Sequence, residues 1–150
     1  MDLLLWRHAE AEAGEPDLGR GLTAKGQKQA ARVAEWLDRN VAGNCRILVS
    51  PADRAQQTAA ALGRKFKTVA ELAPGHTVSE LLSAADWPNS RESVLLVGHQ
   101  PTLGLAAALL IAGSEMSWSI RKGAVWWISR RARDGFEQTY LRAVANPDLL

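Results

Sequence analysis

Short apolar runs alternate along this chain with segments in which apolar residues recur at helical spacing. The run at residues 3–6, Leu-Leu-Leu-Trp, is continuously apolar, which is typical of a strand buried on both faces of a sheet. We predict strands over residues 3–6, 46–50, 67–72, 93–98, 123–130 and 135–144. The last two strands flank an Arg-Asp-Gly sequence, which favours an antiparallel hairpin at an edge of the sheet.

Helices are predicted in the segments between these strands. The first is amphipathic, with Thr23 as its N-cap and Gly43 as its stop. Pro51 is predicted to occupy the first helical position of the second helix, because proline is favoured there. A short helix is predicted over residues 77–87, and an apolar helix covered by its neighbours over residues 101–113.

Strands that alternate with helices predict an α/β fold, in this case a three-layer α/β/α sandwich. Its sheet is expected to be mostly parallel, with an antiparallel C-terminal edge strand. The length of 150 residues fits a single domain over residues 1–150, and 47% hydrophobic residues suffice for its core.

Charge and cysteine content narrow the class of protein. The formal net charge is +2, and the basic residues are scattered, which is too weak a pattern for a nucleic-acid-binding surface. The longest nearly uncharged stretch, residues 101–114, is too short to cross a bilayer, and residues 3–6 are too short for a signal peptide. The single Cys45 excludes an internal disulfide. We therefore expect a cytoplasmic, monomeric protein that does not bind membranes.

Basic side chains follow three of the predicted strands at the point where each strand ends. Arg7 and His8 close the first strand, Arg54 follows the second, and His99 follows the strand at residues 93–98. Because ligands of open α/β sheets bind outside the carboxyl ends of the strands, we expect these four side chains to meet.

Two arginines and two histidines that meet at one point form a pocket for a tetrahedral dianion. Guanidinium groups match phosphate oxygens, and the helix that follows Pro51 adds unpaired N–H groups. A neutral imidazole is also a nucleophile toward phosphorus, and positive neighbours lower the pKa of a histidine and so favour its neutral form. The predicted ligand is phosphate or a phosphoryl group.

Three ordered motifs carry a resemblance to a known family: RHAEAE at residues 7–12, SPADRAQQTA at 50–59 and VGHQP at 97–101. With them the chain resembles the histidine phosphatase (phosphoglycerate mutase-like) superfamily, and its size resembles the small phosphohistidine phosphatases of the SixA branch. The resemblance implies that His8 is the phosphorylated nucleophile. It also implies that Arg7, Arg54 and His99 bind the transferred phosphoryl group. Arg20, in DLGRGLT, matches a further basic position that contacts phosphate or the substrate peptide.

The sequence departs from the family pattern at Ala9, where the first motif commonly has glycine. It also does not reveal a general acid, since the carboxylates of Glu10, Glu12, Glu71 and Glu80 are candidates of equal weight. A phosphohistidine substrate needs acid catalysis less than a phosphate ester, because its leaving group is an imidazole with a reference pKa near ~6.5.

The predicted substrate is a phosphohistidine of another protein, for example a phosphorelay domain. Relatives that act on small phosphosugars usually insert a lid, but only 34 residues separate Thr58 from Ser93, and the predicted strand and helix use most of them. No cofactor and no metal are expected.

Three alternatives stay open. A metal-dependent phosphoesterase would use ligands from His8, Glu10, His76 and His99, although no HxH or HxxxH pair occurs. A non-catalytic module would bind phosphate or phosphohistidine without turnover. A phosphatase of small phosphate esters, or a mutase, would use the same pocket. Outside the motifs, His76 is predicted to lie at the surface, Cys45 to be inert, and the six tryptophans to serve packing.

Overall fold

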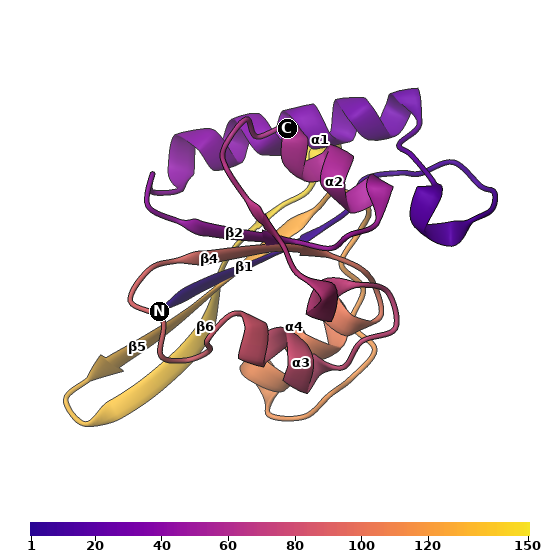
Figure 1. Cartoon of the computed structure of the whole chain (residues 1–150). Helices are drawn as coiled ribbons and strands as arrows, with labels where there is room; N and C mark the ends of the chain where they lie inside the picture. The colour runs from indigo at the N-terminus through magenta and orange to yellow at the C-terminus, as the bar shows by residue number, and fades with distance from the viewer.

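Strand β1 (Asp2–Arg7) runs through the interior of a six-stranded sheet in the computed structural model, which describes residues 1–150 (Figure 1). The other strands are β2 (Arg46–Val49), β3 (Lys67–Thr68), β4 (Val94–Gly98), β5 (Val125–Arg133) and β6 (Phe136–Ala145). The strand order is β3-β2-β4-β1-β5-β6. Strands β1 to β4 are parallel to one another. Strand β5 is antiparallel to β1, and β6 is antiparallel to β5. The predicted fold is thus confirmed, with two antiparallel strands at the C-terminal edge.

Helices cover both faces of the sheet. Helices α1 (Ala24–Asn40) and α2 (Asp53–Ala60) lie on one face, and α3 (Val78–Ala84) and α4 (Thr102–Ala112) on the other (Figure 1). The apolar run of β1 serves both layers, because side chains alternate across a strand. Leu4 and Trp6 pack with α1 and α2, while Leu3 and Leu5 pack with α3 and α4. All four side chains are fully buried.

Several predicted boundaries were wrong for local reasons. The strand predicted over residues 67–72 pairs only at Lys67 and Thr68, because its partner β2 ends at Val49, and a 3-10 helix over Ala70–Leu72 follows. The second helix begins at Asp53, so Pro51 precedes the helix and Ala52 is the N-cap.

The remaining helices differ less from their predicted ranges. Helix α1 is capped by Thr23 as predicted, but it ends at Asn40, three residues before Gly43, because Val41 is already extended. Helix α3 ends at Ala84, short of the predicted residue 87. Helix α4 is buried along one side only, and Leu105, Leu109 and Leu110 stay partly exposed. None of the helices combines the length and the apolar character needed to cross a membrane.

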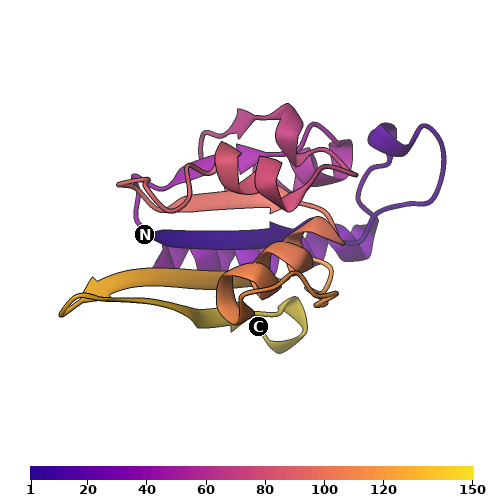
Figure 2. The same ribbon diagram turned by 90° about the horizontal axis from the view of Figure 1, so that it is seen from below.

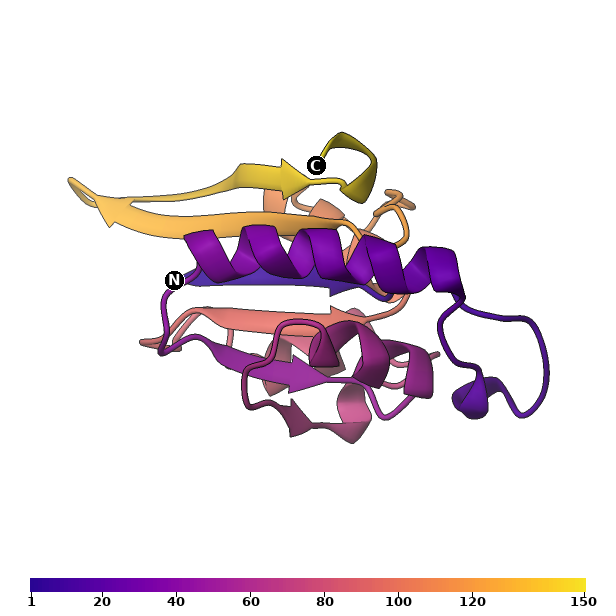
Figure 3. The ribbon, with the colours of Figure 1, turned by 90° about the horizontal axis from the view of Figure 1, so that it is seen from above.

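The carboxyl ends of the parallel strands lie at one end of the molecule, and the loop between β1 and α1 projects from that end (Figures 2 and 3). This loop carries a short 3-10 helix, η1 (Asp17–Gly19). The β5–β6 hairpin extends in the opposite direction and turns at Asp134 and Gly135, both with positive φ. The predicted Arg-Asp-Gly turn is therefore confirmed.

Candidate active site

A polar cavity of about 230 Å³ lies at the carboxyl ends of β1 and β4. The structure brings all five sequence-predicted site residues to it. Its lining residues are Arg7, His8, Ala11, Arg20, Arg54, Pro74, His99, Gln100 and Lys122. Four of these nine residues are arginine or lysine, and none is a carboxylate, so the cavity favours an anion.

The backbone after β1 fixes the tautomer of His8. Its Nδ1 lies 2.8 Å from the carbonyl oxygen of Ala9. A carbonyl oxygen only accepts hydrogen bonds, so Nδ1 carries the ring proton and Nε2 keeps its lone pair. The side chain is 8% exposed, and burial lowers the pKa of His8 to about 4, with further lowering by Arg54, Arg7 and Arg20. The imidazole is therefore neutral near pH 7.

His99 faces His8 across the cavity, with 5.1 Å between the ring centroids. Its Nε2 lies 2.7 Å from Oγ of Ser50, the residue that follows β2. Burial lowers the pKa of His99 to about 3, and the neighbouring His8 and Arg54 add to this effect. A Ser50 hydroxyl that donates to Nε2 leaves the ring proton on Nδ1, so that Nδ1 is a hydrogen-bond donor.

Arg54 comes from the first turn of α2 and is 4% exposed. Its Nη1 donates to the carbonyl oxygen of Asp17 at 2.8 Å, and its Nη2 lies 3.2 Å from Oδ2 of the same residue. Arg20 contacts the other oxygen of the Asp17 carboxylate, with Nε–Oδ1 of 3.1 Å. The hydrogen bond from Arg54 lowers the pKa of the Asp17 carboxyl. Asp17 therefore holds two arginines of the cavity in place.

Arg7 approaches the cavity from the end of β1. Its Nη1 donates to the carbonyl oxygen of Ile120 at 3.0 Å, which orients the guanidinium. Burial lowers the pKa of Arg7, and the neighbouring Arg121 adds to the lowering.

Buried nitrogen atoms without a protein partner gather at this cavity. Four buried side-chain polar atoms in the chain lack a hydrogen-bond partner, and three of them are Arg7 Nε, Arg54 Nε and His99 Nδ1. Unpaired buried polar groups are rare in proteins because each costs free energy of desolvation. Their concentration here indicates a site built for a ligand that accepts hydrogen bonds.

Two positioning residues were missed by the sequence analysis. Thr58 is fully buried, and its Oγ1 accepts from Ala9 N at 3.0 Å and donates to the carbonyl oxygen of Arg54 at 2.7 Å. It thereby ties the turn after His8 to the helix that carries Arg54. Asp17 was also missed, although its spacing of three residues from Arg20 was visible in DLGRGLT.

The four candidate general acids lie outside the cavity. Glu71 and Glu80 line a separate pocket beside α3, and Glu80 forms a capping box with Thr77. Glu10 accepts from Thr23 Oγ1 through its Oε1 at 3.1 Å. Glu12 is exposed, and its carbonyl oxygen accepts from Arg20. Four further lining residues were not predicted from the sequence. Ala11 and Gln100 lie within the motifs RHAEAE and VGHQP, whereas Pro74 and Lys122 come from loops whose course no pattern predicts.

Other ionisable residues lie apart from this chemistry. His76 is partly exposed and pairs with Glu80, with Nδ1–Oε2 of 2.6 Å. Burial raises the pKa of the Cys45 thiol to about 11, so its reactive thiolate is suppressed. No three His, Cys, Asp or Glu side chains lie close enough together to share a metal ion.

Residues 3–77 match the family model described as histidine phosphatase superfamily (branch 1). A Haemophilus influenzae protein named phosphohistidine phosphatase SixA homolog is 33% identical over 127 residues, covering 73% of this chain and 77% of that protein.

Solved structures show the same similarity. A protein from Agrobacterium tumefaciens, described as a candidate phosphohistidine phosphatase SixA, has a TM-score of 0.80 at 25% identity and covers 97% of both chains. A similarly described SixA protein from Nakamurella has a TM-score of 0.77 at 27% identity, covering 97% of this chain and 95% of that one.

Proposed function

Because this chain belongs to the histidine phosphatase superfamily, we propose that it is a metal-independent phosphatase that removes the phosphoryl group from a phosphohistidine of another protein. The observation that carries the proposal is the state of His8. Its ring is neutral, its Nδ1 donates to Ala9, and its Nε2 is free in a cavity lined by arginines.

In the first step, the Nε2 lone pair of His8 attacks phosphorus in line with the leaving group. A P–N bond forms on His8, and the P–N bond to the substrate imidazole breaks. The bonding electron pair returns to the substrate nitrogen, which takes up a proton from solvent. The guanidiniums of Arg7 and Arg54 and the Nδ1 of His99 donate to the equatorial oxygens and stabilise their charge.

In the second step, water attacks the phosphorus on His8, and the electron pair of the breaking bond returns to Nε2. Inorganic phosphate leaves, and the neutral ring is restored. The bond from Nδ1 to the Ala9 carbonyl persists through both steps, so the ring keeps its orientation. The covalent intermediate thus splits one hydrolysis into two in-line displacements.

The lining of the cavity supports this substrate class. No Asp or Glu lines it, so a poor leaving group such as a serine alkoxide would have no carboxylic acid to protonate it. An imidazole leaves without that help. The Haemophilus relative named as a SixA homolog supports the same substrate.

Access to the cavity also supports a protein substrate. Of residues 59–92, which would carry a lid, only Pro74 lines the cavity. This segment forms β3, η2 (Ala70–Leu72) and α3 instead. A phosphorylated side chain that projects from a folded domain can therefore reach Nε2 of His8.

Phosphorus NMR of enzyme that is quenched during turnover and separated from the substrate, which is itself a phosphoramidate, tests the intermediate. We expect a phosphoramidate signal in the wild type and none in His8→Gln, whereas His76→Gln, a matched histidine outside the cavity, keeps the signal. Turnover is expected to be unchanged by a chelator and inhibited by vanadate. A phosphoramidate signal that persists in His8→Gln would refute the assignment of the nucleophile.

The same preparations test the substrate class. We expect hydrolysis of a phosphohistidine domain to exceed that of sugar phosphates by at least about 100-fold in kcat/KM, a difference of roughly 2.7 kcal/mol in transition-state stabilisation. Rapid hydrolysis of sugar phosphates, with the phosphohistidine domain left intact, would contradict the proposed substrate. Tight binding of that domain without release of phosphate would instead indicate a non-catalytic module.

A further inference from the structure

A second polar cavity, of about 270 Å³, lies beside the candidate active site. It is lined by Arg7, Glu10, Lys25, Gln29, Arg121, Lys122, Asn146 and Asp148. We call it the flanking cavity. Arg7 and Lys122 line both cavities, so the two share a wall. No apolar side chain lines the flanking cavity.

The charges of the flanking cavity are unbalanced. Four of its lining residues are cationic and two are carboxylates, which leaves a local excess of two positive charges. Arg7, Arg121 and Lys122 have no carboxylate within the 4.0 Å of an ion pair, whereas nine other arginines and lysines of the chain do. These three cations are available to an anionic partner.

The loop that carries Arg121 and Lys122 is held against the nucleophile strand. The N–H of Gly123 donates to the carbonyl oxygens of Arg7 at 3.2 Å and His8 at 3.1 Å. The indole N–H of Trp6 donates to the carbonyl oxygen of Gly123 at 2.9 Å. The backbone that carries the two cations is therefore held beside His8 before any partner binds, which reduces the backbone entropy lost on binding.

Close packing at Gly123 maintains this arrangement. Its φ is +76°, and an added Cβ would lie 3.2 Å from Gln29 of α1 and 3.4 Å from Pro147. Glycine thus lets the loop approach both α1 and the short helix η3 (Pro147–Leu149), and Asp148 of η3 and its N-cap Asn146 complete the lining. Four separate segments of the chain converge on the flanking cavity.

Resting on the proposed function, we infer that the flanking cavity binds carboxylate side chains next to the phosphohistidine of the substrate protein. A segment with its phosphohistidine at His8 and an Asp or Glu a few residues away would place the carboxylate beside Arg121 and Lys122. The absence of an apolar lining disfavours an aliphatic or aromatic anchor. The exposure of Arg121 and Lys122 suits a protein surface, because both can be reached from solvent.

Binding of two matched peptides tests the inference without requiring turnover. Both carry a stable phosphonate analogue of phosphohistidine, flanked by glutamates in one peptide and by glutamines in the other. At low salt we expect wild-type protein to bind the acidic peptide roughly tenfold more tightly. In Arg121→Glu this preference should fall to about one. A third peptide with flanking lysines should bind Arg121→Glu more tightly than it binds wild type.

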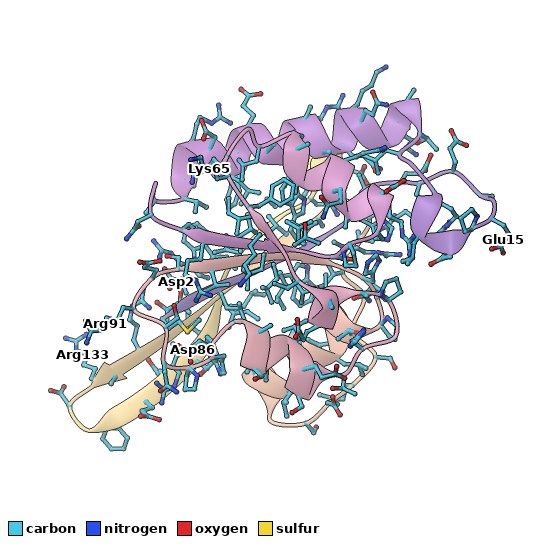
Figure 4. The ribbon with its side chains drawn as sticks, in the orientation of Figure 1. Asp2, Glu15, Lys65, Asp86, Arg91 and Arg133 are labelled. Atoms are coloured by element: carbon cyan, nitrogen blue, oxygen red, sulfur yellow. The ribbon has the colours of Figure 1, made fainter.

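Arg91→Glu is the matched control. Arg91 is exposed, makes no ion pair, and lies at the end of the molecule opposite the loop that carries Glu15 (Figure 4). Arg91→Glu changes the net charge by the same amount as Arg121→Glu. The Arg91→Glu variant should nevertheless keep the wild-type preference for the acidic peptide.

Three outcomes would overturn the inference: equal wild-type binding of acidic and neutral peptides, an equal loss of preference in Arg91→Glu and Arg121→Glu, or stronger competition by free phosphoserine than by the acidic peptide. The last would assign the cavity to a small phosphorylated acid. A separate measurement with a hydrolysable phosphohistidine substrate shows whether the proposed function fails. In that case the protein releases no phosphate and forms no phosphoryl adduct on His8.

Discussion

At His8, burial contributes most to the lowered pKa, ahead of the neighbouring guanidiniums. This distinguishes the site from a simple cationic cluster, in which solvent would screen the arginines. An ordinary imidazole with a pKa of about 6.5 is only ~3% neutral at pH 5. With a pKa of about 4, His8 is mostly neutral at that pH and stays competent for attack.

We predict that the ring of His8 titrates near pH 4 rather than near ~6.5. Nitrogen NMR of histidine-labelled protein, with His8 assigned by the signal missing from His8→Gln, measures this midpoint. Above the midpoint, Nδ1 should give the signal of a protonated nitrogen and Nε2 that of an unprotonated one. A midpoint above pH 6, or the reverse tautomer, would contradict the proposal that His8 attacks as a neutral nucleophile.

The site residues that could be predicted from the sequence differ from those that could not in how the fold positions them. Arg7, His8 and His99 follow buried strands, so the topology of the sheet alone brings them together. Asp17 and Thr58 act through contacts that depend on the course of a loop and the packing of α2. No periodicity encodes such contacts, and Thr58 looks like any residue on a buried helix face.

Among the elements, α1 determines the position of the loop after His8 through one close approach. The N-terminal turn of α1 contacts the backbone of Glu10, whose carbonyl oxygen accepts from Thr23 N at 3.0 Å. Gly26 makes this contact possible, since an added Cβ would lie 2.0 Å from the same oxygen. A side chain at this position must displace either the helix or the loop.

We predict that Gly26→Ala destabilises the protein by about 3 kcal/mol and lowers phosphatase activity, because backbone must move to relieve the overlap. Gly43→Ala is the matched control: an added Cβ there would contact nothing within 4 Å, and the change should shift stability by less than about 1 kcal/mol. Urea unfolding of both variants gives the comparison. Equal free energies of unfolding for the two variants would show that α1 can shift to accommodate the added Cβ without loss of stability.

The boundaries of elements depended on partners that the sequence pattern does not identify. Residues 67–72 have a strand-like composition, yet their strand pairing stops at Thr68 because the partner strand β2 ends at Val49. The parallel core strands were predictable because their apolar runs need burial on both faces. An edge strand takes its length from its neighbour, so its own composition does not determine where it ends.

For the whole molecule, the buried histidines couple folding to pH. His8 and His99 have pKa values of about 4 and about 3 in the folded protein, below the ~6.5 of an unfolded chain. Between these values the unfolded state binds more protons than the folded state, so the free energy of unfolding falls as the pH falls. This contribution is fully present above about pH 7.

We predict that lowering the pH from 7 to 4 reduces the free energy of unfolding by on the order of 3 kcal/mol through each of these two residues. Urea titrations at several pH values measure the slope. In the double variant His8→Gln/His99→Gln this slope should be shallower, whatever its stability at pH 7. An unchanged slope would mean that other groups control the acid sensitivity.

The hydrogen bond from Nδ1 of His8 to the Ala9 carbonyl also has a consequence for the regioisomer of the proposed phosphoenzyme. Nδ1, the pros nitrogen, already donates to the backbone carbonyl of Ala9. Phosphorus can therefore bond only to Nε2, the tele nitrogen. The tele adduct leaves the pros N–H donating as before, and no ring flip is needed between turnovers.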